Sequence, residues 1–246
     1  MYKRQAFLEW VSIGSLALTA ATALIPFVAA SMLMCRRQHG QRMSAINDVC
    51  RDAGWLCVVE PMGDVRDAAW AEIGHLHAEL RTRGEGVYLV VDGDVDGRPF
   101  AIIEHRCRVT NGRMTKTVNH VIAVTSCPDE WPTVTLSNEA RLHWLSGLVG
   151  LEQLEVSLGN PSFDARWRVR TTDAEFAADV LSPDAQNLVE QAPSEETWEI
   201  GHGRICCIRK GSLFPHAVES LALRVTGFRR KLPKSLDEWT AVKRSA

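Results

Sequence analysis

The chain has 246 residues, of which 46% are hydrophobic and 24% are charged, and its formal net charge at neutral pH is −2. This composition is typical of a folded protein and excludes a largely disordered one. The near-neutral charge provides no overall attraction to nucleic acid, so we expect no nucleic-acid partner.

The longest uncharged stretch lies near the N-terminus, where residues 11–34 read VSIGSLALTAATALIPFVAASMLM. As a helix this stretch would be about 36 Å long, which is enough to cross the hydrocarbon layer of a bilayer. Trp10 precedes it and Arg36 and Arg37 follow it, as interfacial anchors do. We therefore predict a single transmembrane helix, with membrane lipid as its partner. The alternative is a secretory signal cleaved after Ala30, although the apolar run is longer than such signals use.

The charges beside this stretch favour one orientation. Arg36, Arg37 and Arg42 follow it, whereas the basic residues before it are partly offset by Glu9, so the positive-inside rule favours a cytoplasmic main domain. The cysteine count is odd and includes an adjacent pair at 206 and 207, which does not fit a disulfide framework. We expect a single-pass protein of the cell membrane with its soluble part in the cytoplasm. The inverted topology is the alternative.

After the membrane segment, apolar side chains recur at helical spacing in residues 43–54 and again in residues 70–84. Strand-like segments bounded by Asp/Gly and Asn-Gly turns follow. They lie at residues 87–91, 98–110, 115–127 and 132–136. These four segments predict an antiparallel meander, and the spacing of leucines predicts a helix over 137–150.

The second half repeats the order of strands followed by helices. Residues 163–171 alternate as a strand, Thr172 and Glu175 form a capping box at a helix start, and Ser182-Pro183 starts another helix. A hairpin is expected over 197–210 and an amphipathic helix over 213–228. The acidic run from 173 to 199 predicts a solvated helix pair, with docking of a basic partner as the alternative.

The predicted fold class is therefore α+β, with an N-terminal transmembrane helix followed by an antiparallel β-meander with packed helices. The domains are expected as a membrane anchor and juxtamembrane segment at 1–42, a soluble α+β domain at 43–231, and a basic C-terminal tail at 232–246. If the tail lies inside the cell, its cations would suit an anionic leaflet.

The segment Asp92-Gly-Asp94-Val-Asp96-Gly97 begins like the calcium-binding loop of an EF-hand. Such a loop requires a bidentate glutamate at its twelfth position, which is Ile103 here, and helices on both sides. Because strand-like segments flank this one, we interpret it as a hairpin turn.

Histidine and cysteine spacing gives two candidate metal sites. His75 and His77 would point to different faces of a helix, so we interpret them as surface residues. His105 and Cys107 share one face of a strand, and His120 or Cys127 would approach from the neighbouring strand. The competing interpretation is that Cys107 packs in the core with His105 at its edge.

Nucleophile candidates are Ser146 and the pair Cys206/Cys207 near His202. Ser146 lacks the turn that exposes a catalytic serine. The segment GHGRIC begins like a phosphate loop but leads into a strand. We interpret all of these as structural.

Four segments of the chain resemble a group of bacterial membrane-anchored proteins that carry a domain of unknown function. The segments are DGDVDGRPFAIIEHRCRV, TKTVNHVIAV, PTVTLSNE and SFDARWRVRTTDAEFAADVLSP, within residues 85–210. The resemblance implies a membrane-tethered α+β domain and no assigned catalytic residue. The chain departs from the group where His105 and Cys107 stand in place of a tyrosine-rich strand.

We expect a non-catalytic binding or scaffolding domain at the membrane, held by lipid around residues 11–34 and binding another protein. No catalytic, cofactor-binding or metal-binding residue is assigned, and no cofactor is expected. The alternative is a membrane-tethered hydrolase or metal-dependent enzyme whose residues converge only in the folded chain. That alternative would be favoured by four side chains within ligand distance in a cleft: His105, Cys107, His120 and Cys127.

Overall fold

The computed structural model describes residues 29–73, 86–111, 114–138, 154–193 and 196–239. The chain divides into two compact units, residues 1–45 and residues 46–246. Residues 29–53 are helical. Most of the predicted span at 11–34 and most of the expected helix at 137–150 lie outside the described residues. Within the described part of the chain, no helix combines the length and hydropathy needed to cross a bilayer.

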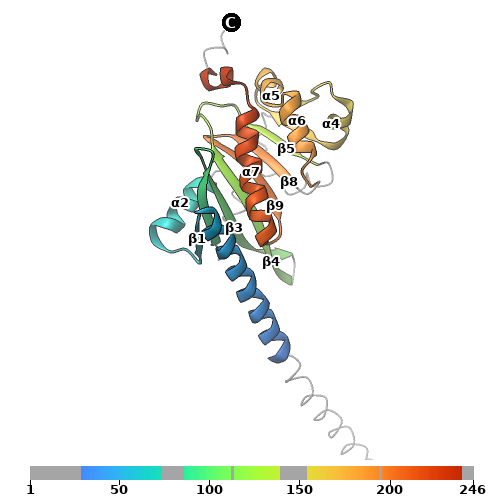
Figure 1. Ribbon diagram of the computed structural model, residues 1–246. Helices are drawn as coiled ribbons and strands as arrows, with labels where there is room; N and C mark the ends of the chain where they lie inside the picture. The colour runs from blue at the N-terminus through green and yellow to red at the C-terminus, as the bar shows by residue number, and fades with distance from the viewer. Residues whose placement is uncertain (1–28, 74–85, 112–113, 139–153, 194–195, 240–246) are drawn as a thin grey trace, which may run out of the picture. The chain divides into compact units, whose positions relative to one another are not determined.

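The second unit is α+β, and its described strands form one antiparallel sheet in the order β1-β2-β3-β4-β9-β8-β5-β7-β6 (Figure 1). The strands are β1 (Leu56–Val59), β2 (Val87–Val95), β3 (Arg98–Asn111), β4 (Met114–Ser126), β5 (Val134–Ser137), β6 (Leu154–Val156), β7 (Arg168–Thr171), β8 (Glu196–Gly201) and β9 (Arg204–Lys210). Strands from both halves of the sequence therefore share one sheet.

The expected meander is confirmed for β2, β3 and β4, and the strand expected over 132–136 exists as β5, but its expected place beside β4 is wrong. β5 does not pair with β4; it lies between β8 and β7, and β9 pairs with β4 instead. The residues Ile205 to Ile208 are buried on both faces of β9. A strand that is apolar on both faces needs an interior position in a covered sheet, and the place beside β4 supplies one.

The β2–β3 hairpin confirms the interpretation of the Asp/Gly segment as a turn. β2 continues to Val95, which pairs with Arg98, so the turn consists of Asp96 and Gly97 alone. Both have positive φ, 54° and 77°, as a two-residue hairpin turn of the I′ type requires. Asp94 Oδ1 accepts a hydrogen bond from Gly97 N at 2.6 Å.

One face of the sheet packs against α2 (Gly63–Ile73). Ala69 and Ile73 of this helix join a buried cluster with Ile103, Ile122 and Ile208 from β3, β4 and β9. Arg204, at the start of β9, pairs with Glu72 of the same helix. We call this the α2 face.

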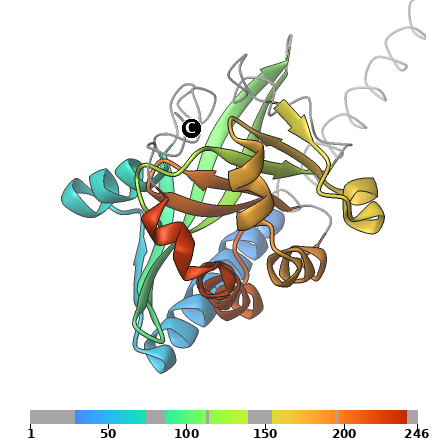
Figure 2. The ribbon, with the colours of Figure 1, turned by 90° about the horizontal axis from the view of Figure 1, so that it is seen from above.

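The opposite face packs against α7 (Pro215–Lys231), which lies across β3, β4 and β9 (Figures 1 and 2). Trp198 of β8 contacts Phe228 of α7, with ring centroids 5.0 Å apart. Burying an aromatic pair of this kind is worth about 0.5–1.5 kcal/mol beyond the area it removes from water. We call this the α7 face.

Three shorter helices follow β6 and β7. They are α4 (Pro161–Arg166), α5 (Ala174–Val180) and α6 (Pro183–Glu190). The strand expected over 163–171 is wrong for residues 163–166, which belong to α4, because Asn160 caps a helix there and Pro161 suits its first turn; only β7 is a strand. The helix after Thr172 is confirmed, but its cap is Asp173 rather than Thr172, because Asp173 Oδ1 accepts from Phe176 N at 3.0 Å. Ser182 precedes α6 as expected.

The segment that follows α7 packs against the core of the unit to which it belongs. The 3₁₀ helix η2 (Lys234–Glu238) buries Leu236, and Trp239 after it is also buried. Trp131 Nε1 donates to the Leu236 carbonyl at 2.8 Å. Residues 232–239 of the expected tail thus contribute to the core.

Candidate functional site

Two histidines and a cysteine lie together on the α2 face. His105 of β3 is directly opposite His120 of β4, and Cys107 follows two residues later on the same face of β3. Their ligand atoms all lie within 4.8 Å of one another, and Cys107 Sγ is 3.8 Å from His120 Nδ1. We call these three residues the His/Cys cluster. Imidazole and thiolate groups at this spacing match the donors that zinc and copper prefer.

Burial and packing fix the members of the cluster. His105 is fully buried, Cys107 is 4% exposed, and His120 is half-buried. Trp70 of α2 meets the His105 ring edge to face, with centroids 5.2 Å apart. Cys107 Sγ also donates to the Val118 carbonyl at 3.5 Å. Because the ligand-bearing residues sit on interior strands, their positions are set by the sheet rather than by a loop.

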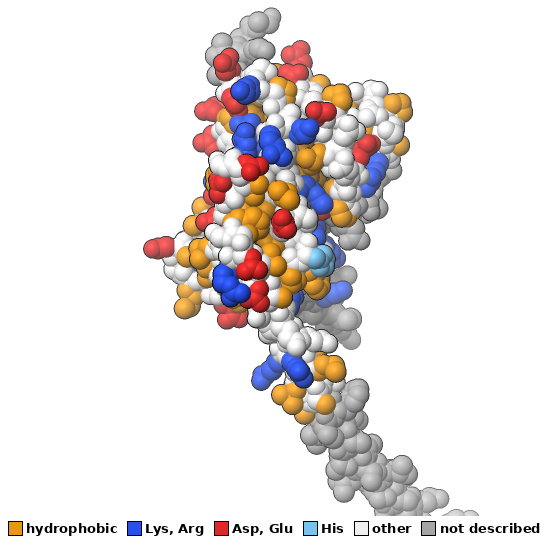
Figure 3. Space-filling view, in the orientation of Figure 1, with side chains coloured by type: hydrophobic (Ala, Val, Ile, Leu, Met, Phe, Trp, Pro, Cys, Tyr) orange, Lys and Arg blue, Asp and Glu red, His pale blue; other side chains and the backbone are white. Residues whose placement is uncertain are grey.

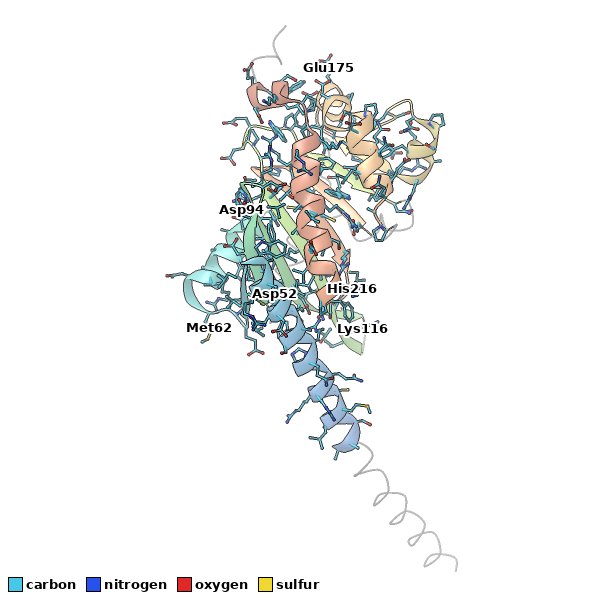
Figure 4. The ribbon with its side chains drawn as sticks, viewed as in Figure 1. Asp52, Met62, Asp94, Lys116, Glu175 and His216 are labelled. Atoms are coloured by element: carbon cyan, nitrogen blue, oxygen red, sulfur yellow. The ribbon has the colours of Figure 1, made fainter. Side chains whose placement is uncertain are left out.

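A hollow of about 480 Å³ lies beside this cluster. It is lined by Arg106 of β3, residues 116–119 of β4, and residues 210–212 at the end of β9. Arg106, Lys116 and Lys210 are basic, and none of the lining residues is acidic. Lys116, labelled in Figure 4, lies near the start of β4. We call this the basic hollow, and a site with this charge attracts anions.

Hydrogen bonds hold the wall of the basic hollow in place. Asn119 Nδ2 donates to Ser212 Oγ at 2.7 Å and to Glu104 Oε1 at 3.3 Å. Glu104 Oε2 accepts from Leu213 N at 2.9 Å, which ties β3 to the segment before α7. The Arg106 guanidinium stacks on the Tyr88 ring, 3.9 Å from its centroid. The polar wall is therefore preorganised by contacts from several strands.

Of the four residues whose convergence would favour an enzyme, the structure brings together three. Cys127 is the exception: it follows the far end of β4, and its thiol donates to the Pro128 carbonyl at 3.6 Å. Burial raises the pKa of Cys127 to about 12, so its thiol is protonated at neutral pH.

The adjacent cysteines of β9 point to opposite faces, as alternation along a strand requires. Both are buried, and burial raises the pKa of Cys206 and of Cys207 well above the usual range. Since the thiolate is the nucleophile, neither is activated for attack. His202 lies in the exposed β8–β9 turn, where its Nε2 is 3.1 Å from Thr133 Oγ1.

The remaining candidate residues from the sequence do not belong to the His/Cys cluster. His75, His77 and Ser146 lie outside the described residues. Asp92 and Asp94 are part of β2. The acidic run is not uniformly solvated, because Glu196 and Glu199 belong to β8 and are buried.

The basic residues at the C-terminal end of α7 are paired with acids. Arg229 pairs with Asp237, Arg230 with Asp96 at 3.1 Å, and Lys231 with Asp184 at 3.6 Å. Figure 3 shows basic and acidic side chains intermingled in this region. These ion pairs offset part of the positive charge that the sequence predicts for the C-terminal segment.

The basic hollow was not predicted from the sequence. Arg106 and Lys116 were visible as basic residues in strand-like segments, but Lys210 lies almost a hundred residues away. Only the pairing of β4 with both β3 and β9 places the three residues on neighbouring strands, where alternation puts Lys116 and Lys210 on the α2 face and Arg106 on the α7 face.

No family model matches the chain, and no curated protein matches it. Among solved structures, the chain is similar to the mycobacterial trehalose monomycolate transport factor A, TtfA, with 12% sequence identity and a TM-score of 0.47. The similarity covers 79% of this chain and 96% of that chain.

Proposed function

We propose that this protein is a membrane-anchored, non-catalytic binding protein whose α+β unit holds an anionic ligand in the basic hollow. The observation that carries the proposal is the composition of the lining of that hollow, which includes one basic residue from each of β3, β4 and β9 and no acidic residue. A ligand bearing a phosphate or carboxylate group fits this charge.

Membrane anchoring is supported by the uncharged run at residues 11–34. At the end of this run the chain is helical, and Met32, Leu33 and Met34 expose most of their side-chain surface. Helical apolar side chains with no protein cover suit contact with lipid.

We propose a cytoplasmic location for the α+β unit, because arginines 36, 37 and 42 follow the apolar run. Cys35 is exposed and adjoins that run, so it is a natural reporter. A membrane-impermeant maleimide applied to intact cells should leave Cys35 unlabelled until the cells are permeabilised. Labelling of intact cells would place this flank outside.

The anchor itself is tested by alkaline carbonate extraction of membranes. The full-length chain should stay in the membrane pellet, and a chain without residues 11–34 should be released. Release of the full-length chain, or an N-terminus cut after Ala30, would refute the anchor.

Ligand binding is tested by calorimetry on the full chain in nanodiscs of zwitterionic lipid. The probes are inorganic phosphate, succinate and monomeric dihexanoylphosphatidylglycerol. Each of Arg106→Gln, Lys116→Gln and Lys210→Gln should weaken binding about fivefold, since one cation near an anionic surface is worth about 1 kcal/mol. Lys234→Gln, an exposed lysine away from the hollow, is the matched control.

The probes also separate two sources of the ligand. Binding of phosphate or succinate without the lipid indicates a soluble anion, and binding of the phospholipid indicates a headgroup. If none of the probes binds, or if the control variant weakens binding as much as the hollow variants do, the proposal fails.

A second candidate function is a membrane-tethered metal-dependent enzyme, favoured by the His/Cys cluster. Three protein ligands leave one position of a tetrahedral metal open to water, as in catalytic zinc sites. Zinc-loaded protein should then hydrolyse 4-nitrophenyl acetate, and Cys107→Ser should abolish that turnover. Equal turnover by the two proteins would eliminate this candidate.

A further inference from the structure

We infer that His105, Cys107 and His120 form a binding site for a transition-metal ion of the zinc class. The inference rests on the cluster alone and is independent of ligand binding in the basic hollow. It also requires no catalysis, so zinc binding without turnover would support this inference while eliminating the enzyme.

The spacing of the three donors matches what zinc requires. Zinc lies about 2.3 Å from a thiolate sulfur and about 2.0–2.1 Å from an imidazole nitrogen, which places S and N about 3.6 Å apart in a tetrahedral site. Cys107 Sγ and His120 Nδ1 are 3.8 Å apart, and all three ligand atoms lie within 4.8 Å of one another. Metal binding therefore requires the donors to move together by up to about 1 Å from the spacing in this structure.

The donor types select the metal. The cluster has one thiol and two imidazoles and contains no carboxylate. Magnesium and calcium bind oxygen ligands, whereas a thiolate with imidazoles selects zinc or copper. The fourth position is open to water or an added ligand.

The surrounding charges permit this site. A zinc ion bound by one thiolate and two neutral imidazoles carries a net charge of +1. Lys210 is the strand partner of His120, and Lys116 lies further along β4, but both side chains are exposed to solvent. Because water surrounds both side chains, a high effective dielectric reduces their repulsion of the ion, and they weaken the site without preventing it.

The competing interpretation is a packing role, in which the Cys107 thiol stays protonated and donates to the Val118 carbonyl. The two interpretations differ in an observable way. Metal binding requires the thiolate as a ligand, whereas the packing role predicts no sulfur–metal bond.

The test uses full-length protein, with any affinity tag removed, kept reduced and loaded with zinc before desalting. We expect one zinc ion per chain, and cobalt in its place should give the near-ultraviolet charge-transfer band of a cobalt–thiolate bond. Cys107→Ser and His120→Ala should each weaken binding by at least about 100-fold, because loss of a supporting outer ligand alone costs 10–100-fold.

Matched controls remove the same residue types elsewhere. Cys127→Ser changes a cysteine outside the cluster, and His216→Ala changes an exposed histidine of α7. Both should bind zinc as the unmodified protein does. Binding that is unchanged in Cys107→Ser, or reduced equally in the controls, would overturn the inference.

X-ray absorption on the unmodified protein keeps the test decisive if a cluster variant does not fold. One sulfur and two imidazole nitrogens around zinc support the site. A shell of oxygen and nitrogen without sulfur, or the absence of retained zinc, rejects it.

Discussion

At the scale of single residues, buried glutamates on the sheet differ in how they are held. Glu104 accepts hydrogen bonds from Leu213 N and Asn119 Nδ2. Glu196 pairs with Arg224 of α7 and accepts from Cys207 Sγ at 3.2 Å. Glu199, on the α2 face, lies opposite Cys206, and burial raises its pKa to about 8. Desolvation therefore dominates the pKa of Glu199.

The raised pKa of Glu199 predicts a pH-dependent stability. The folded chain keeps this proton between about pH 4.5 and 8, where the unfolded chain has lost it, so stability should fall as pH rises through that range. Glu199→Gln should remove the fall and be more stable than the unmodified protein at pH 9 by about 2–4 kcal/mol. Urea unfolding between pH 5 and 9 measures this. Parallel pH profiles for the two proteins would contradict it.

Loss of the Glu104 carboxylate should destabilise the fold. In Glu104→Gln the amide nitrogen opposes either Leu213 N or Asn119 Nδ2, so one buried donor loses its acceptor, which costs about 1–3 kcal/mol. Urea unfolding reports the loss, and faster hydrogen exchange at the Leu213 amide locates it. Glu219→Gln, on the exposed side of α7, should change the free energy of unfolding by less than about 0.5 kcal/mol.

At the scale of elements, β2 continues through Gly93, although the sequence indicates that the strand ends at residue 91 and a turn follows. An Asp/Gly segment reads as a turn, yet Gly93 pairs with Phe100 inside the hairpin. A Cβ at this position would lie 2.7 Å from Trp55 Cγ and 3.1 Å from Phe100 Cε1. Glycine is present here because the Trp55 ring covers the strand.

Gly93→Ala should therefore push Trp55 off the strand. The expected loss is about 1–3 kcal/mol, as for other overpacked sites, read as a lower urea midpoint. Gly40→Ala is the comparison, because that helical glycine has open space at its Cβ position. It should be neutral or stabilising by up to about 1 kcal/mol. Equal effects of the two changes would mean that Trp55 adapts freely.

Local sequence signals predicted most of the elements. Alternation and turn residues located β2, β3, β4 and the β8–β9 hairpin, but the strand predicted over 163–171 covers both α4 and β7. The start of α5 was displaced by one residue because aspartate caps as well as threonine does. The pairing of β9 with β4 was not predicted, because strand order depends on contacts across eighty residues. The His/Cys cluster could be predicted only in part. Alternation places His105 and Cys107 on one face, but placing His120 with them requires the register between β3 and β4. A slip of one residue in that register would put His120 on the other face.

At the scale of the whole molecule, the continuous sheet makes residues 46–246 one unit, and residues 1–45 belong to another. We expect a fragment of residues 43–246 to stay in solution without detergent and to unfold in a single transition. Its urea midpoint should match that of the full chain in detergent, because its core comes from its own strands and helices. Aggregation of the fragment, or a much lower midpoint, would show that the N-terminal residues contribute to folding.

The paired thiols of β9 also give the molecule an internal reporter. Cys206 and Cys207 are sealed on opposite sides of an interior strand, so an alkylating reagent can reach both only when the layers on the two sides have separated. The rate at which these adjacent cysteines gain their labels together therefore measures how often the entire sheet opens.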